Sequence, residues 1–338
     1  MEYLTDHMSS VNWQMGKENS YLLKWIASLL WQLIDRILNK AYAMDIFYSP
    51  KQVCTVNSPS RSPEKPRLVM DKLMSGSFAG DLTTHDDFVP FDNGEFLVAH
   101  EATYVESFFA GELSNNAEIR WSEEFAESVR YTNSSLYHAI KFATQNPNSL
   151  VLSPTSGFHH AGPNAGWGFC TFSGQVIGSV KRWRETGAVG AYLDLDGHYG
   201  NSIGDSLGFC PDVNEAITWN FNPVGFGESY VTEVRDAMIE LETMVDAKAV
   251  DYLVWCHGAD SHEDDDLGHN VNTEQWLECS EIFYSLVKRK RNEGFNVPVV
   301  MALFGGYRAD PPGVYENYKL VVDLHVQDLE LGMRILER

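Results

Sequence analysis

The sequence predicts an α/β fold with a central, mostly parallel sheet and helices on both faces. Short apolar runs rich in β-branched residues recur along the chain, and helical stretches separate many of them. Each run is apolar throughout instead of alternating with polar residues, as in strands that are buried on both sides. Strands that alternate with helices form a parallel sheet whose crossover helices cover both faces.

The first predicted strand covers residues 45–48, which read DIFY. A stretch with three Ser-Pro steps, SPKQVCTVNSPSRSPEKPR, follows it and predicts a loop. The other predicted strands are 149–153, 189–195, 216–221, 250–256, 298–304 and 319–324, and the clearest helices between them are 229–247 and 273–292. Ligands in such sheets bind at the carboxyl ends of the strands, so the residues that follow these runs are candidates for a site.

Residues 20–38 read SYLLKWIASLLWQLIDRIL and predict an amphipathic helix. Its apolar face includes Trp25, Leu29, Leu33 and Ile37. The helix is too short and too polar to span a membrane. Because a face of this size is rarely left exposed, we expect it to be covered by the same chain, by lipid or by a second subunit of a homo-oligomer.

The chain has 338 residues and a formal net charge of −22. A charge of this sign and size argues against a nucleic-acid-binding protein, because it repels a phosphate backbone. Cationic partners such as polyamines and lysine-rich tails fit it better. The five cysteines are scattered with no CxxC pair, and no cleavable signal peptide is recognisable. We therefore expect a cytoplasmic protein with no transmembrane segment and no disulfide framework.

Acidic and histidine side chains follow two of the predicted strands. In DLDGH, Asp194, Asp196 and His198 alternate with Leu195 and Gly197, so all three can point to one side. Two carboxylates and one imidazole with an open fourth position suit a catalytic Zn²⁺ ion. A second acidic loop, GADSHEDDDLG, follows the strand at 250–256 and would reach the same edge of the sheet.

Two further segments follow predicted strands. The segment GFHHAGPNAGWGFC contains His159 and His160, which can serve as a general base beside a glycine-rich backbone. The segment GGY ends in Tyr307, whose phenol could donate a hydrogen bond to a developing oxyanion. Taken alone, a loop histidine pair and a turn tyrosine are ordinary structural features. The order of all four segments along the chain is the stronger observation.

Together these four segments resemble the histone deacetylase family, including its bacterial histone deacetylase-like amidohydrolases and acetylpolyamine amidohydrolases. The resemblance runs from about Ile46 to the chain end and is densest at GFHHAGPNAGWGFC, LDLDGHYGN, GADSHEDDDLG and GGY. It implies the three-layer arginase/deacetylase fold with one active-site metal ion. It also divides the chain into an N-terminal extension, residues 1–43, and a deacetylase catalytic domain, residues 44–338.

The resemblance implies a set of metal ligands. Asp196 and His198 would be two of them, joined by the second aspartate of the pattern G-x-D-x4-D-x-L-G. Counting along GADSHEDDDLG makes that aspartate Asp265, with the following Leu-Gly setting the register between the neighbouring Asp264 and Asp266. Zn²⁺ would be the metal ion, and Fe²⁺ could replace it.

The resemblance also assigns the residues around the metal. His159 and His160 match the histidine pair, with His160 as the proton shuttle and Asp194 orienting His159. Asn201 would be the partner of His160, where an aspartate often stands in the family. A neutral partner stabilises the charged ring less, so it would make His160 less basic.

Two parts of the match concern the substrate. Tyr307 matches the oxyanion-binding tyrosine, and Gly168 and Phe169 match the wall of the acyl-lysine tunnel. Tyr199 departs from the family, which usually has a histidine there. The stretch that helps to bind a structural K⁺ ion is replaced by residues around Asn220 and Asn222, which puts a K⁺ site in doubt.

The implied function is a zinc-dependent deacetylase that hydrolyses the amide of an acetylated amine. The substrate would be acetyl-lysine in a protein or an acetylated polyamine. The alternative is a catalytically inactive binding protein that keeps the deacetylase fold. A ureohydrolase of the related arginase fold would need further Asp or His ligands for its two Mn²⁺ ions, and the His159-His160 pair and the GGY segment speak against it.

Overall fold

The computed structural model describes residues 44–55, 60–76, 81–309 and 318–337. The amphipathic helix predicted at 20–38, and with it the extension 1–43, lies outside these ranges, so its proposed role in a homo-oligomer stays a prediction. Within them, no helix combines the length and the apolar character needed to cross a bilayer.

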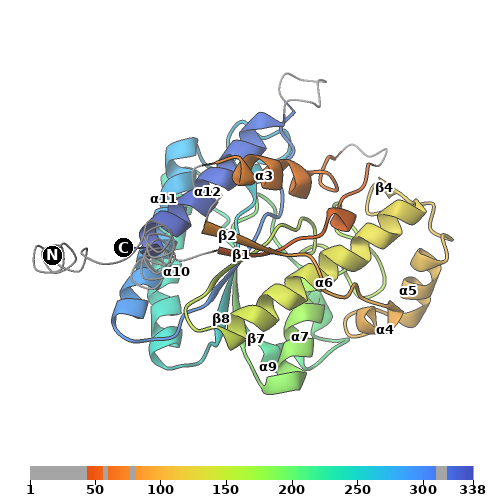
Figure 1. Cartoon of the computed structure of the whole chain (residues 1–338), viewed down its shortest axis with the longest axis horizontal. Helices are drawn as coiled ribbons and strands as arrows, with labels where there is room; N and C mark the ends of the chain where they lie inside the picture. The colour runs from red at the N-terminus through yellow and green to blue at the C-terminus, as the bar shows by residue number, and fades with distance from the viewer. Residues whose placement is uncertain (1–43, 56–59, 77–80, 310–317, 338) are drawn as a thin grey trace, which may run out of the picture. The chain divides into compact units, whose positions relative to one another are not determined.

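A seven-stranded sheet lies at the centre of the described domain, in the order β2-β1-β5-β9-β8-β6-β7 (Figure 1). Every neighbouring pair is parallel. The strands are β1 (Met44–Phe47), β2 (Leu82–His85), β5 (Leu150–Ser153), β6 (Gly190–Asp194), β7 (Ile217–Phe221), β8 (Tyr252–Cys256) and β9 (Val299–Ala302). A separate short hairpin consists of β3 (Asn115–Asn116) and β4 (Ile119–Arg120).

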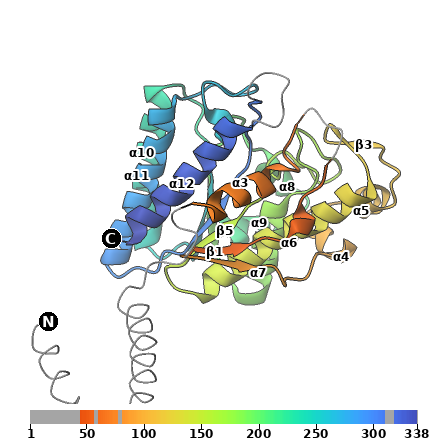
Figure 2. The ribbon, with the colours of Figure 1, turned by 45° about the horizontal axis from the view of Figure 1, so that its top comes forward.

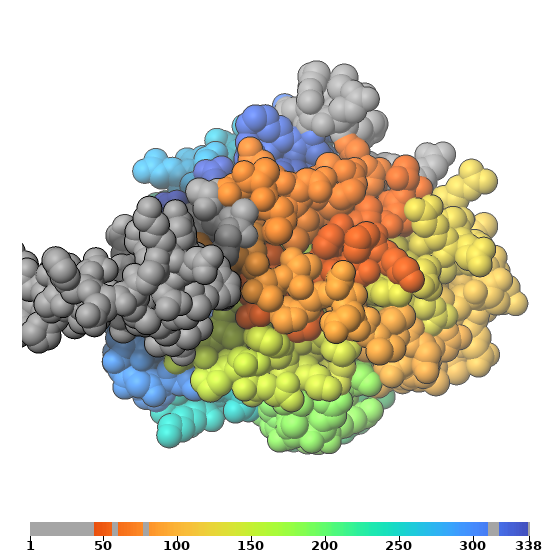
Figure 3. Space-filling view, viewed as in Figure 1, coloured from red at the N-terminus to blue at the C-terminus, as the bar shows by residue number. Residues whose placement is uncertain are grey.

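Helices cover both faces of the sheet (Figures 1 and 2). One face packs against α3 (Lys65–Met74), α10 (Glu228–Asp246), α11 (Thr273–Asn292) and α12 (Lys319–Glu337). The other packs against α6 (Glu123–Gln145), α7 (Gly174–Thr186) and α9 (Val213–Ala216), with α4 (Asn93–Phe96) and α5 (Ala102–Phe109) beyond them. On the surface seen in Figure 3, the segment that includes α3 lies between α12 and α6. The predicted α/β class and its parallel sheet are therefore confirmed.

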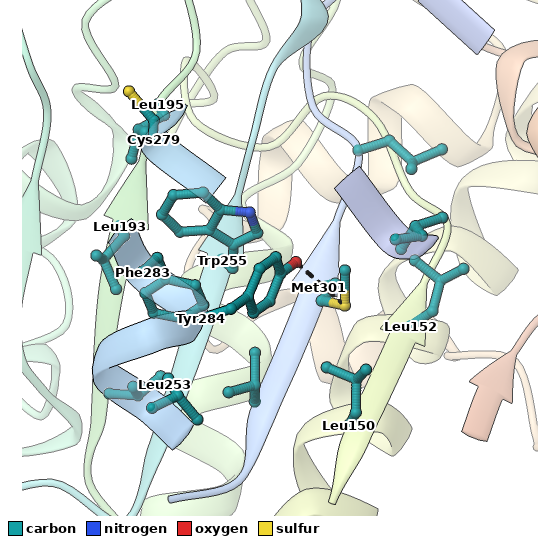
Figure 4. Packing of buried hydrophobic residues seen from close by; sticks show 14 of the residues in the cluster. Leu150, Leu152, Leu193, Leu195, Leu253, Trp255, Cys279, Phe283, Tyr284 and Met301 are labelled. Atoms are coloured by element: carbon teal, nitrogen blue, oxygen red, sulfur yellow. Dashed lines mark hydrogen bonds between the residues drawn. The ribbon is translucent and has the colours of Figure 1, made fainter. Parts of the chain in front are cut away.

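Alternate residues of each strand enter the two core layers, which is why the strands read as continuous apolar runs. In β8, Leu253 and Trp255 belong to the layer under α10, α11 and α12, whereas Val254 belongs to the layer under α6 and α7. The Trp255 ring stacks on Phe283 of α11, with centroids 4.2 Å apart, as Figure 4 shows. This packing fixes the strand whose carboxyl end enters the candidate site.

Six of the seven predicted strands are observed, and the strand predicted at 319–324 is wrong. Those residues form the start of α12, whose apolar residues Val322, Val326, Leu329 and Met333 recur at helical spacing well beyond the short run KLVVDL. Strand β2 was not predicted, because LTTH is a partly exposed edge strand with no apolar run.

Candidate metal centre and active site

Three side chains that could hold a metal ion meet at the carboxyl edge of the sheet. Asp196, His198 and Asp260 each offer a ligand atom, and these atoms all lie within 4.8 Å of one another. Asp196 and His198 follow β6, and Asp260 lies in the short 3₁₀ helix η3 (Ala259–Ser261) that follows the neighbouring strand β8. Parallel strands bring the loops after them to one edge, so these residues converge although 62 positions separate His198 from Asp260.

The three side chains, which we call the metal group, contact one another directly. His198 Nδ1 lies 2.8 Å from Asp260 Oδ2 and 3.3 Å from Asp196 Oδ1. The backbone N–H of Gly197 donates to Asp260 Oδ1 at 2.9 Å, and that of Gly305 donates to Asp196 Oδ2 at 2.7 Å. A Cβ atom on Gly305 would overlap both carboxylates, so only glycine lets this loop approach them.

The electrostatics of the metal group favour a cation. Hydrogen bonds with Asp196 and Asp260 raise the pKa of His198 to about 10. Burial, together with the charge of Asp196, raises the pKa of Asp260 to about 7. Burial opposes ionisation of Asp196 as well, but His159 and His198 outweigh it and hold the pKa of Asp196 below its usual range. Buried carboxylates of this kind need a positive charge, which protons supply here and a divalent metal ion would supply equally well.

This arrangement predicts that metal binding releases protons, because a metal ligand imidazole must be neutral. With the pKa of His198 near 10, we expect about one proton released per ion at pH 8. More should be released at pH 6, since Asp260, with its pKa near 7, then also carries a proton. Calorimetric titration of metal into metal-free protein, in buffers of different ionisation enthalpy, measures this number. Binding without proton release at pH 8 would contradict the assignment of His198.

The structure does not bring the predicted ligand Asp265 into the metal group; Asp260 takes that place. Asp265 Oδ2 accepts hydrogen bonds from the backbone N–H groups of Tyr307 at 2.7 Å and Arg308 at 3.0 Å, and its Oδ1 accepts one from Leu267. The reason is geometric. The turn after β8 directs Asp260 back toward the sheet edge, whereas Asp265 lies five residues farther along and anchors the loop that carries Tyr307.

The two histidines of the predicted pair lie side by side, with ring centroids 4.0 Å apart. His159 Nδ1 lies 3.0 Å from Asp194 Oδ2, and His160 Nδ1 lies 2.9 Å from Asn201 Oδ1. Burial disfavours a charge on His159, but the carboxylates of Asp196 and Asp194 outweigh it and raise its pKa to about 9. Burial, followed by the charge of His159, lowers the pKa of His160 to about 4. Neighbouring imidazoles are thus set to opposite protonation states at neutral pH.

The hydrogen bonds of Asn201 fix the tautomer of His160. Asn201 Nδ2 donates to Asp205 at 2.5 Å, so its Oδ1 faces His160 and can only accept. We therefore place the single proton of neutral His160 on Nδ1. Nε2 then carries the free lone pair, as a general base requires.

The predicted tunnel wall is a tight turn. Trp167 and Cys170 pair through two backbone hydrogen bonds of 3.0 and 2.9 Å, and Gly168 and Phe169 between them have φ of 54° and 60°. A Cβ atom on Gly168 would lie 2.6 Å from His160 Cδ2. The turn places the Phe169 ring 5.4 Å from that of Tyr307, which in turn lies 6.3 Å from the ring of His198.

Two residues beside this site were not predicted from the sequence. Trp167 packs edge-to-face against His160 with centroids 4.8 Å apart, although 61% of its surface is exposed. The glycines on both sides of it were the available signal. Lys65, which the sequence analysis placed in a loop, is fully buried and donates from Nζ to the carbonyls of Phe304 and Gly305. Burial lowers the pKa of Lys65 to about 8.

Asn220 and Asn222, which replace the K⁺-binding stretch of the family, differ in their contacts. Asn222 Oδ1 accepts a hydrogen bond from the backbone N–H of Gly200 at 2.8 Å. Asn220 Oδ1 and Asp194 Oδ1 are buried, and no described residue donates a hydrogen bond to either of them. These contacts do not test K⁺ binding. That the chain departs from the family at its K⁺ site stays a prediction from the sequence.

Comparison with known proteins gives a family match for part of the chain. Residues 60–223 match the family model described as histone deacetylase domain. This segment of the chain matches the histone deacetylase family. The matched range contains His159, His160, Asp194, Asp196 and His198, whereas Asp260 and Tyr307 follow it.

Two solved structures share the fold of this chain. The HD domain of HDA15 is 15% identical with a TM-score of 0.63, and the alignment covers 88% of this chain and 94% of that domain. An acetylpolyamine aminohydrolase from Burkholderia pseudomallei is 16% identical with a TM-score of 0.61, covering 87% of this chain and 99% of that protein. At such identities the likeness shows the fold, which is the three-layer arginase/deacetylase fold predicted from the sequence.

Proposed function

We propose that this chain is a zinc-dependent deacetylase that hydrolyses the amide bond of an acetylated amine. The observation that carries the proposal is the position of a neutral histidine, a charged histidine and a tyrosine around one potential metal site. The ring of His160 lies 6.1 Å from that of His198, and the ring of Tyr307 lies 6.3 Å from the same histidine. An amide bound at this point would meet a base, a proton donor and a cation site together.

Asp196, His198 and Asp260 would hold the metal ion. Two carboxylates and one imidazole leave a coordination position open, which is the donor set of a catalytic zinc site, and Fe²⁺ is compatible with the same ligands. A bound Zn²⁺ ion supplies Lewis acidity toward the amide carbonyl and lowers the pKa of a bound water.

The protein's own groups then account for the proton transfers. His160 Nε2 accepts the proton of the attacking water, because the ring is neutral and Nδ1–H is committed to Asn201. The same nitrogen returns that proton to the leaving amine. His159 keeps its charge at neutral pH, since its pKa is about 9, and its positive charge stabilises the negative charge that develops nearby.

Tyr307 would donate a hydrogen bond to the carbonyl oxygen as it becomes negative. Burial, followed by the charge of Asp260, raises the pKa of the Tyr307 phenol well above its usual range, so the hydroxyl keeps its proton. Asp265 supports this role through the backbone N–H groups of Tyr307 and Arg308. The proposal therefore gives Asp265 a part in positioning the tyrosine.

Replacing Asn201 by aspartate tests the role of His160. A carboxylate at this position stabilises the charged imidazole, so we expect the acid limb of the kcat/KM profile to move to higher pH by about one unit or more. The matched control is Asp205→Asn, which removes a negative charge one hydrogen bond farther from the ring and should move the limb slightly to lower pH. An acid limb that Asn201→Asp leaves unmoved would exclude His160 as the titrating base.

Two substrate classes remain in the proposal, acetyl-lysine in proteins and acetylated polyamines. The charge of −22 favours a cationic product in either class. Acetate release from a panel of acetyl-lysine peptides and acetylated polyamines, assayed with zinc-reconstituted protein, tests the function and separates the classes. If the protein binds zinc but hydrolyses none of them, the alternative of an inactive binding protein with a deacetylase fold is favoured.

A further inference from the structure

A second buried polar cluster lies behind the turn that carries Asp260. It consists of His257 after β8, Trp276 and Ser280 of α11, and Asp328 of α12, each at most 4% exposed. None of these residues takes part in the proposed chemistry. Burying a polar side chain costs free energy unless it is hydrogen-bonded or ion-paired. The contacts of these four residues therefore indicate which parts of the fold they hold in place.

The cluster is tightly connected. The Trp276 ring stacks on His257 with centroids 3.6 Å apart and planes 8° from parallel. His257 Nδ1 lies 3.2 Å from Ser280 Oγ and 3.6 Å from Asp328 Oδ2. The Trp255 indole N–H donates to the same oxygen of Asp328 at 3.1 Å. His257 therefore joins the end of β8 to two helices at once.

The direction of these hydrogen bonds follows from burial. Burial lowers the pKa of His257, so the ring is neutral and carries one proton. Both neighbouring oxygens face Nδ1, and we place the proton there. No described residue contacts Nε2 through a hydrogen bond. His257 thus donates to Ser280 of α11, with the Asp328 carboxylate of α12 3.6 Å from the same nitrogen, and its orientation depends on both residues.

The same cluster contacts the turn before Asp260. The carbonyl of Gly258 accepts hydrogen bonds from Trp276 Nε1 at 3.2 Å and from Ser261 Oγ at 2.9 Å. A Cβ atom on Gly258 would lie 2.5 Å from Asp260 Oδ1 and 2.8 Å from the Cα of Asp196. No space separates this turn from the metal group, so a shift of the turn would displace Asp260.

We propose that His257 is a positioning residue for the metal group: held by Asp328 and Ser280 and clamped by Trp276, it fixes the Gly258 turn and thereby the carboxylate of Asp260. This role rests on the proposed function, because it concerns the metal ligands. It predicts that the donor at His257 Nδ1 sets metal affinity as well as stability. Partners behind the ligands of metal sites typically change affinity by about ten- to a hundredfold when they are removed.

Two substitutions separate positioning from packing. His257→Asn keeps an N–H donor near the place of Nδ1, whereas His257→Leu keeps an apolar side chain of similar bulk without a donor. The control is Ser179→Ala, which removes a fully buried hydroxyl bonded to Tyr192 and Tyr252 away from the metal group. Zn²⁺ affinity of the full chain, metal-free at the start, is measured by competition with a chelator of known affinity, and thermal unfolding is followed in parallel.

We expect all three variants to lose some thermal stability. Zn²⁺ affinity should fall by about tenfold or more in His257→Leu, stay within about threefold of wild type in His257→Asn and remain unchanged in Ser179→Ala. Should His257→Leu fail to fold, Asp328→Asn, which preserves side-chain shape, is expected to weaken binding by more than about threefold. Wild-type affinity in His257→Leu, or in Asp328→Asn where that variant replaces it, overturns the inference. Equal weakening in the Leu and Asn variants also overturns it. Wild-type protein that binds no Zn²⁺ overturns the proposed function itself.

Discussion

Asp260→Ala is expected to release the metal ion, weakening Zn²⁺ binding by more than about a hundredfold and abolishing measurable turnover. Loss of a partner behind a ligand costs about ten- to a hundredfold, so loss of a direct ligand should cost more. The buried Asp260 carboxylate lies 2.8 Å from His198 Nδ1 and accepts a hydrogen bond from the backbone N–H of Gly197. Metal content after gel filtration and Zn²⁺ affinity by chelator competition measure the effect.

Asp265→Ala provides the contrast. It should retain the metal ion, because Asp265 binds the backbone of Tyr307 and Arg308 and stands outside the metal group. Turnover should nevertheless fall, since the loop that carries Tyr307 loses its anchor. Asp264→Ala, at an exposed position beside it, is the control and should change neither property. Metal retained in Asp260→Ala and lost in Asp265→Ala would restore Asp265 as the third ligand.

Tyr307→Phe is expected to lower kcat by about a hundredfold or more while the protein stays folded and keeps its metal ion. This is the usual cost of removing one donor to an oxyanion. KM should change little, because the hydrogen bond strengthens as the negative charge develops. Tyr199→Phe is the control, since Tyr199 is 65% exposed beside His198 and has no proposed role in the reaction. Turnover within about threefold of wild type in Tyr307→Phe would remove the tyrosine from the mechanism.

The fold could be predicted where burial acts on both faces of a strand. Strands β5, β8 and β9 are buried at every position, so their sequences are apolar without interruption. The run KLVVDL at 319–324 has the same composition but belongs to α12, because a short apolar run does not distinguish a strand from one face of a helix. Edge strand β2 was missed for the opposite reason, since its residues are only partly buried.

The candidate site could be predicted where the family resemblance fixes a residue by the motif around it. His159 and His160 are neighbours in sequence, and the structure sets them beside Asp194 and Asn201, the partners that the resemblance implies. The choice between Asp260 and Asp265 depends on the turn after β8, which spacing does not describe. Lys65 Nζ donates a hydrogen bond to the carbonyl of Gly305, which lies 240 residues farther along the chain. A contact between such distant residues leaves no pattern in the sequence around Lys65.

Zinc-dependent hydrolysis is tested most directly by acetate release from an acetylated amine during stepwise addition of Zn²⁺ to the metal-free full chain, with bound metal determined at each step. We expect activity to be absent without metal and to rise in proportion to bound Zn²⁺ until about one ion per chain is bound. In Asp260→Ala, neither bound Zn²⁺ nor activity should rise in this way. Acetate release from metal-free protein, or a requirement for two ions per chain, would contradict this expectation.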